Sequence, residues 1–195
     1  VNTKTAKNPP ARDAWEKMPP QTGHVMAIDI KSGETLWKTE KYKIAPLTLT
    51  VRNGQVYYSN YEQVVSLDLN TGGKIWNSKS LMPEKGGFRG TCGTLVAQDN
   101  VIFYSYPPPD KRSYNAFAKT VALSAETGEI LWEGPKNFGP GIANPPDLFV
   151  SDGLVWLGSN AGHDGKSTKV ERKGFDPVNG EAHREISVPH LRSSG

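Results

Sequence analysis

Residues 160–166 carry the side chains best suited to acid–base chemistry. The segment reads Asn-Ala-Gly-His-Asp-Gly-Lys and places His163 beside Asp164. A histidine next to a carboxylate can exchange protons near neutral pH or bind a metal ion. The same Gly, Asn and Asp content is typical of a solvated loop between strands, and the other histidines are distant in sequence (His24, His183 and His190). We therefore favour a solvated loop and keep His163 and Asp164 as candidate binding residues.

A second candidate is the glycine-rich segment 85–93, which contains Arg89 and Cys92. Its glycines would let backbone amides approach an anion, helped by the Arg89 guanidinium. The segment lacks the spacing of a phosphate loop that ends in Lys-Ser/Thr, so a tight connection with Cys92 packed as a small hydrophobic residue is the simpler interpretation. Because Cys92 is the only cysteine, the chain alone can build no disulfide, cysteine-based zinc site or iron–sulfur cluster.

Residues 104–112 form a third candidate, with three consecutive prolines between aromatic and basic residues. The prolines favour an extended, stiff backbone. Long insertions on a rigid scaffold commonly carry recognition. A contact surface and a plain connection are both open interpretations of this segment.

These candidate loops lie between copies of a repeated motif that is found four times. Its pattern is small–apolar–Asp–x–x–Ser/Thr–Gly–x–x–apolar–Trp, a strand, a tight turn and a returning strand. The glycine takes the positive-φ position of a three-residue hairpin loop. The third copy has Ser124 in place of the Asp, and the fourth has Arg184 in place of the Trp. The copies span residues 27–37, 66–76, 122–132 and 174–184.

A second hairpin precedes each of the last three copies, with an apolar strand, an Asn/Asp-containing turn and an aromatic-rich strand. Four antiparallel strands per repeat make a propeller blade. We predict an all-β fold, a partial β-propeller of about 3.5 four-stranded antiparallel blades. Closed propellers have about 4–8 blades, so the prediction is a fragment of a larger ring. The expected boundaries are a connection at 1–23, a half blade at 24–40, blades at 45–80, 91–136 and 146–190, and a further connection at 191–195.

The motif resembles the tryptophan docking motif of PQQ-like, quinoprotein-type propellers. Residues 24–190 are similar to the C-terminal propeller region of large bacterial multidomain PQQ-like repeat proteins, some of which carry a methyltransferase-like region upstream. The resemblance implies that the Trp of one blade packs over the Gly turn of its neighbour. The implied docking residues are Trp37, Trp76 and Trp132, and the receiving turns are those of Gly33, Gly72, Gly128 and Gly180.

The same resemblance raises the question of a cofactor. Quinoprotein alcohol dehydrogenases stack pyrroloquinoline quinone (PQQ) between a Trp and a vicinal disulfide, and hold Ca²⁺ with carboxylate and amide oxygens. Here Cys92 lies between Thr91 and Gly93, so no vicinal pair exists. We predict no cofactor for this segment. The favoured function is a non-catalytic binding or scaffolding propeller, and the alternative is part of a PQQ-dependent dehydrogenase whose cofactor site lies largely outside this segment.

Charge and hydropathy narrow the possible partners. The net charge is +3 from 23 basic and 20 acidic residues with interspersed signs, without the basic stripe of a nucleic-acid surface. No apolar run approaches the roughly 18 residues of a membrane helix. We expect the partners to be the remaining blades of the same polypeptide, together with a protein or small ligand on the loops. Similar propellers occur in bacterial outer-membrane assembly, which favours the periplasm or cell envelope.

Overall fold

The described part of the chain consists of strands, turns and connections, without a helix. The computed structural model describes residues 21–46, 48–81, 93–106, 119–135, 148–158 and 169–189. Arg89, Cys92, His163 and Asp164 lie outside the described residues, as does most of the proline-containing segment. No helix in the described ranges has the length and apolar character needed to cross a membrane. The strands are β1 (Thr22–Gly23), β2 (Met26–Ile28), β3 (Thr35–Lys38), β4 (Tyr42–Lys43), β5 (Thr50–Arg52), β6 (Gln55–Ser59), β7 (Val64–Asp68), β8 (Lys74–Asn77), β9 (Thr94–Gln98), β10 (Val101–Tyr106), β11 (Lys119–Ser124), β12 (Ile130–Glu133), β13 (Leu148–Ser151), β14 (Leu154–Gly158), β15 (Lys169–Phe175) and β16 (Ala182–Pro189).

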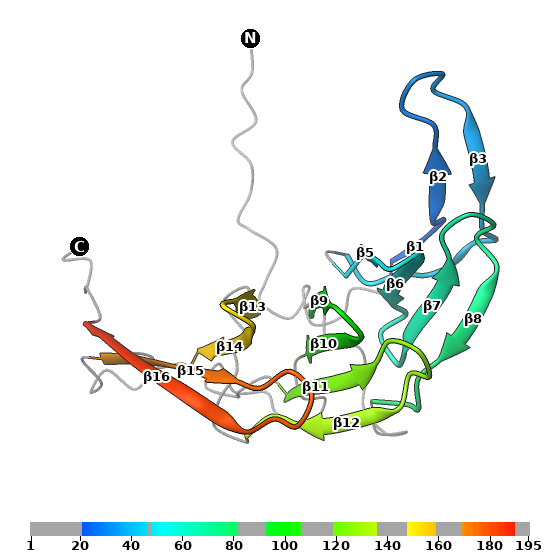
Figure 1. The fold of residues 1–195 in the computed structure, drawn as a ribbon. Helices are drawn as coiled ribbons and strands as arrows, with labels where there is room; N and C mark the ends of the chain where they lie inside the picture. Colours follow the sequence, from blue (N-terminus) through cyan, green and yellow to red (C-terminus); the bar gives the residue numbers. More distant parts are fainter. Residues whose placement is uncertain are drawn as a thin grey trace, which may run out of the picture.

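Three sheets contain four antiparallel strands each, and in each sheet neighbours in sequence are neighbours in space. We name them blade 2 (β5–β8), blade 3 (β9–β12) and blade 4 (β13–β16), and the two-stranded sheet β2–β3 blade 1. Strands β1 and β4 form a separate two-stranded sheet. Figure 1 shows the blades side by side in an open arc from β2–β3 to β13–β16. The predicted all-β, partial-propeller fold is confirmed.

The hydrophobic core lies between the blades. Successive residues of a strand point to opposite faces of its sheet, so a strand buried at every position is covered on both faces. Strand β10 is buried throughout, and the first four residues of β7 are buried too. These central strands therefore read as continuous apolar or aromatic runs rather than as alternating patterns. Each blade consequently depends on its neighbours for a core.

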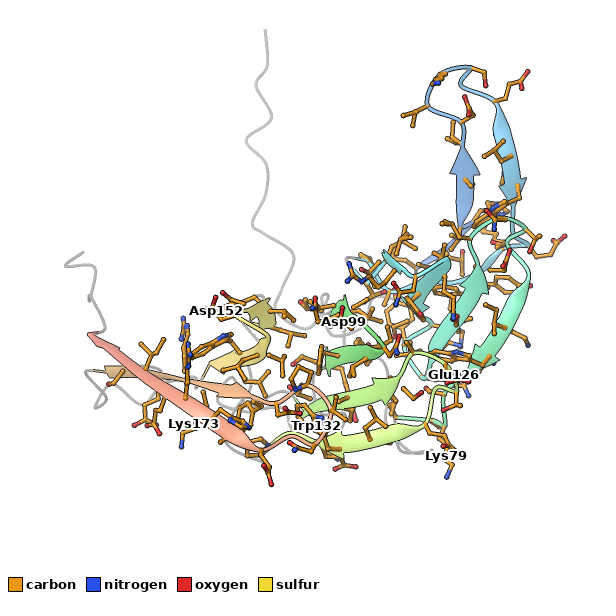
Figure 2. All side chains as sticks on the ribbon, in the orientation of Figure 1. Lys79, Asp99, Glu126, Trp132, Asp152 and Lys173 are labelled. Atoms are coloured by element: carbon orange, nitrogen blue, oxygen red, sulfur yellow. The ribbon has the colours of Figure 1, made fainter. Side chains whose placement is uncertain are left out.

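Two kinds of turn close the hairpins. The turn between the first two strands of each full blade carries a non-glycine residue at positive φ: Asn53 at 48°, Asp99 at 49° and Asp152 at 52°. Asn and Asp tolerate this conformation better than most residues. Figure 2 shows Asp99 and Asp152 on the same rim of the arc. Asp99 also joins blades 2 and 3, because Arg52 Nη2 lies 3.0 Å from its Oδ1 and Asn53 Nδ2 donates to its carbonyl at 2.9 Å.

The second kind of turn is that of the repeated motif. The register of each motif hairpin shifts at the same place, directly after the small residue that faces the Trp or Arg184 position. The motif glycines have φ values of 75°, 69°, 75° and 73° in chain order, at Gly33, Gly72, Gly128 and Gly180. A bulge combined with a glycine in the left-handed region is the usual closure of a three-residue hairpin loop.

Candidate binding surface

The aspartate of the motif holds its turn together. Asp68 Oδ1 accepts hydrogen bonds from the backbone amides of Asn70 at 3.0 Å and Thr71 at 2.8 Å, and from the Thr71 hydroxyl at 2.9 Å. These bonds, the Thr71 side-chain bond first, hold the pKa of Asp68 below its ordinary value. Asp29 and Asp176 act in the same way in their turns, and their pKa values are lowered chiefly by backbone hydrogen bonds. In the third turn Ser124 Oγ accepts one bond, from the Thr127 amide at 3.3 Å.

The tryptophan of each intact motif lies on the turn of the next blade. A Cβ added to Gly72 would lie 2.5 Å from the Trp37 ring, and one added to Gly128 would lie 2.5 Å from the Trp76 ring. Trp132 covers Gly180 in the same way, at 2.7 Å, and Figure 2 shows it between blades 3 and 4. Each indole Nε1 also donates to a backbone carbonyl of the turn that it covers, at 2.8 Å to Leu69, 3.0 Å to Ala125 and 2.9 Å to Pro177.

The fourth motif is built differently. Arg184 occupies the Trp position, is 61% exposed and lies 3.9 Å from Asp152. Trp156 of β14 lies over Gly174 instead, where an added Cβ would be 3.1 Å from the ring. Phe149 stacks on Trp156 with ring centroids 6.2 Å apart. The outer face of blade 4 therefore has its aromatic group on an inner strand and a cation on the edge strand.

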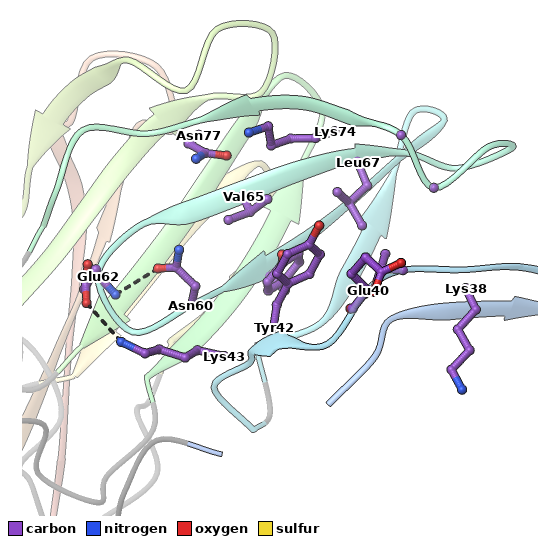
Figure 3. Close-up of a pocket in the computed structure, with 14 residues that line it drawn as sticks. Lys38, Glu40, Tyr42, Lys43, Asn60, Glu62, Val65, Leu67, Lys74 and Asn77 are labelled. Carbon is purple, nitrogen blue, oxygen red and sulfur yellow. Dashed lines mark hydrogen bonds and ion pairs between the residues drawn. The ribbon is translucent and has the colours of Figure 1, made fainter. Parts of the chain in front are cut away.

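A groove with a cavity volume of about 610 Å³ lies between blade 1 and blade 2 (Figure 3). Its walls come from the segment after β3, from strands β6 to β8, and from the Gly72 turn. Sequence reasoning missed this groove because its residues are spread over more than 35 positions. The lining residues are Lys38, Thr39, Glu40, Tyr42, Lys43, Tyr58, Asn60, Glu62, Val65, Leu67, Gly72, Gly73, Lys74 and Asn77.

The groove has an apolar floor and a charged rim. Tyr58, Val65 and Leu67 are buried, at 3%, 4% and 2% exposed, and burial raises the pKa of Tyr58, with a further contribution from neighbouring Tyr42. At the rim Lys43 Nζ lies 3.5 Å from Glu62 Oε1 (Figure 3). Both partners are more than half exposed, so this pair contributes less than about 1 kcal/mol to folding. The charged rim is therefore available to a ligand at little cost in stability.

One sequence signal could have located the groove. Tyr42 follows Trp37 by five residues, as Leu81 follows Trp76. Leu81 packs against the core between blades 2 and 3, whereas Tyr42 is 46% exposed at the groove. A tyrosine where the neighbouring repeat has a leucine marks a boundary between apolar packing and solvent.

The described residues do not fit a quinone cofactor with Ca²⁺. The rings of Trp37, Trp76 and Trp132 lie against glycine turns, and the Trp156 ring is covered by Phe149. Within the described ranges no three His, Cys, Asp or Glu side chains are grouped so that they could hold a metal ion. The geometry of this part of the chain therefore suits binding through a surface groove.

Comparison with known proteins gives a family and a fold. The family described as "Outer membrane protein assembly factor BamB" matches residues 18–144 and 60–182. A search of curated proteins found no match. Among solved structures, a europium-containing methanol dehydrogenase is 14% identical over 82% of this chain and 37% of its own, with a TM-score of 0.56. Quinohemoprotein alcohol dehydrogenase from Comamonas testosteroni is 14% identical over 84% of this chain and 32% of its own, with a TM-score of 0.54.

BamB from Moraxella catarrhalis is also similar, at 17% identity over 84% of this chain, with a TM-score of 0.49. The chain spans 58% of that protein's length. It spans about a third of the length of each dehydrogenase. At these identities the solved structures support a propeller fold, and the family match carries the relationship.

Proposed function

The chain belongs to the family of the outer membrane protein assembly factor BamB, and from this premise we propose that it is a non-catalytic propeller scaffold that binds a segment of another protein. The predicted resemblance to PQQ-like propellers is confirmed by the family and fold comparisons. The remaining blades of the proposed scaffold would come from the same polypeptide. The family also supports a location in the bacterial cell envelope, in the periplasm.

The groove between blades 1 and 2 is the observation that carries this proposal. Its volume of about 610 Å³ lies within the roughly 300–1,000 Å³ range of ligand pockets. The buried floor of Tyr58, Val65 and Leu67 can take an apolar side chain. The rim offers Lys38, Lys43 and Lys74 together with Glu40 and Glu62, which can meet the backbone and charges of an extended segment. An apolar centre with a polar rim is the general organisation of protein-binding surfaces.

Site-specific photocrosslinking in the intact polypeptide tests this proposal. A photoreactive amino acid in place of Tyr42 should give a discrete adduct with one envelope protein. The same residue in place of Val178, which is 67% exposed on the blade 4 turn, should not. Lys74→Glu at the rim should weaken the Tyr42 adduct, and Lys31→Glu on the exposed turn of blade 1 should leave it unchanged. Equal adducts from positions 42 and 178, or no effect of Lys74→Glu, would reject the groove as the binding site.

The alternative is a PQQ-dependent dehydrogenase whose cofactor site lies largely outside residues 1–195. Titration of the intact polypeptide with PQQ and Ca²⁺, followed by quinone absorbance, separates the two functions. The scaffold proposal expects no saturable complex at micromolar quinone. A stoichiometric complex that oxidises an alcohol would replace it.

A further inference from the structure

Four turns of the repeated motif have the same geometry, but only three are covered. The turn of Gly33 matches the others in detail: its glycine has φ of 75°, and Asp29 Oδ1 accepts from the amides of Lys31 at 2.9 Å and Ser32 at 2.8 Å. Gly72, Gly128 and Gly180 each contact an indole ring, whereas an added Cβ at Gly33 would meet nothing within 4 Å. The first turn is therefore fully formed and bare.

The acceptor that the indole uses is also present in the first turn. In the covered turns, Nε1 donates to the residue directly after the motif Asp or Ser, at Leu69, Ala125 and Pro177. The corresponding residue of the first turn is Ile30, which is 96% exposed, whereas Ala125 is 5% exposed. A bare isoleucine and a bare carbonyl at this position leave an apolar contact and a hydrogen bond unmade.

The face of β2 that points away from blade 2 repeats this contrast. Met26 and Ile28 correspond to Val65 and Leu67 of β7, because each pair flanks the small residue opposite the Trp. Val65 and Leu67 are 4% and 2% exposed under blade 1. Met26 and Ile28 are 44% and 51% exposed. Apolar residues at positions that a neighbouring blade covers elsewhere in the molecule mark a docking face.

We propose that the outer face of blade 1 is a docking site for a further blade of the same propeller, whose edge strand carries a tryptophan. Its indole ring lies on Gly33, its Nε1–H donates to the Ile30 carbonyl, and its apolar face covers Met26 and Ile28. A second copy of this chain is a poorer occupant, because the edge strand of blade 4 offers Arg184 in place of the Trp. The site is distinct from the groove, so it stands or fails independently of the proposed function.

The chain itself can supply the test ring. Arg184→Trp restores the motif on the outer face of blade 4 and gives each molecule both a tryptophan donor and the Gly33 turn. Sedimentation equilibrium should show that this variant self-associates at least about tenfold more tightly than the wild type, a difference of about 1.4 kcal/mol. Adding Gly33→Ala should remove the gain. Adding Gly54→Ala should keep it, because Gly54 has φ of 74° and open space around it but no docking role.

A second measurement covers the case in which Arg184→Trp fails to fold. N-acetyl-tryptophanamide titrated into the wild-type chain should shift the Gly33 amide resonance by ring current and leave Gly54 unchanged. Its 1-methylindole analogue, which lacks the N–H donor, should bind more weakly. A tighter Arg184→Trp association that persists with Gly33→Ala, or no selective response at Gly33, overturns the site. Wild-type self-association that Gly33→Ala abolishes would assign the face to a second copy instead.

Discussion

Gly54 and Gly72 have nearly the same backbone conformation but different surroundings. Both lie in the left-handed region, at φ of 74° and 69°, where other residues are strained by roughly 1–2 kcal/mol. Gly54 has open space on its Cβ side, whereas Gly72 faces the Trp37 ring. One glycine is thus required for its conformation, and the other for its conformation and its lack of a side chain.

The two requirements separate in a pair of alanine variants. Gly54→Ala should lower the free energy of unfolding by about 1 kcal/mol from backbone strain alone. Gly72→Ala should cost roughly 1–3 kcal/mol more, because its Cβ forces the indole away from the turn. Urea unfolding of both variants measures the difference. Equal losses would show that the ring yields without cost.

Tyr106 gives the clearest pH dependence in the described residues. It is 3% exposed and stacks on Tyr104 with centroids 5.2 Å apart. Burial, with a smaller contribution from Glu133, raises the pKa of Tyr106 to about 12. A phenol whose pKa is raised on folding stabilises the protein below the unfolded value near 10, and this contribution is lost as pH rises toward 12.

Stability should therefore fall between pH 10 and about 12 more steeply in the wild type than in Tyr106→Phe. Thermal unfolding across this range measures the slope for each protein. Tyr42→Phe at a half-exposed position is the matched control and should follow the wild type. Identical slopes for wild type and Tyr106→Phe would contradict the assignment.

The hairpin is the largest unit that the sequence specifies locally. The Asp–x–x–Ser/Thr–Gly pattern places its carboxylate, hydroxyl and glycine within five residues, so the turn could be predicted without knowledge of the rest of the molecule. The groove could not, because Tyr42, Val65 and Lys74 meet only once blades 1 and 2 pack. The place of Trp156 was hidden for the same reason, since its ring contacts Gly174 and Phe149 across two neighbouring strands.

The four hairpins should differ in their response to acid. Because hydrogen bonds lower the pKa of Asp68, its contribution is present above the ordinary value near 3.8 and is lost as pH falls through the lower folded value. The turn of Ser124 has no carboxylate at this position. Amide exchange between pH 2 and 5, corrected for intrinsic rates, should show the Thr71 amide losing protection before the Thr127 amide. Asp68→Ser should remove the difference, and parallel loss at both turns in the wild type would contradict this account.

At the scale of the whole molecule, the blades share their cores. The cluster between blades 2 and 3 joins Tyr57 and Val64 to Ile102 and Leu123, and the next joins Phe103 to Leu157 and Phe175. No full blade has a core of its own, since burial of both faces requires two neighbours. The stability of the arc therefore depends on the contacts between blades as much as on pairing within them.

Trp76→Ala tests this dependence at the centre of the arc. The indole covers Gly128, donates to Ala125 at 3.0 Å and lies 5.8 Å from the Tyr57 ring. Its removal should lower the free energy of unfolding by about 3–5 kcal/mol, as for other large aromatic truncations in cores. Trp76→Phe keeps a ring but loses the N–H donor, so it should cost less, and Leu36→Ala at a 64% exposed position should cost little. Because the lost contact joins two sheets, the amides of blades 2 and 3 should lose protection together in hydrogen exchange. A loss below about 1 kcal/mol for Trp76→Ala, or one confined to β8, would mean that the tryptophan does not hold the blades together.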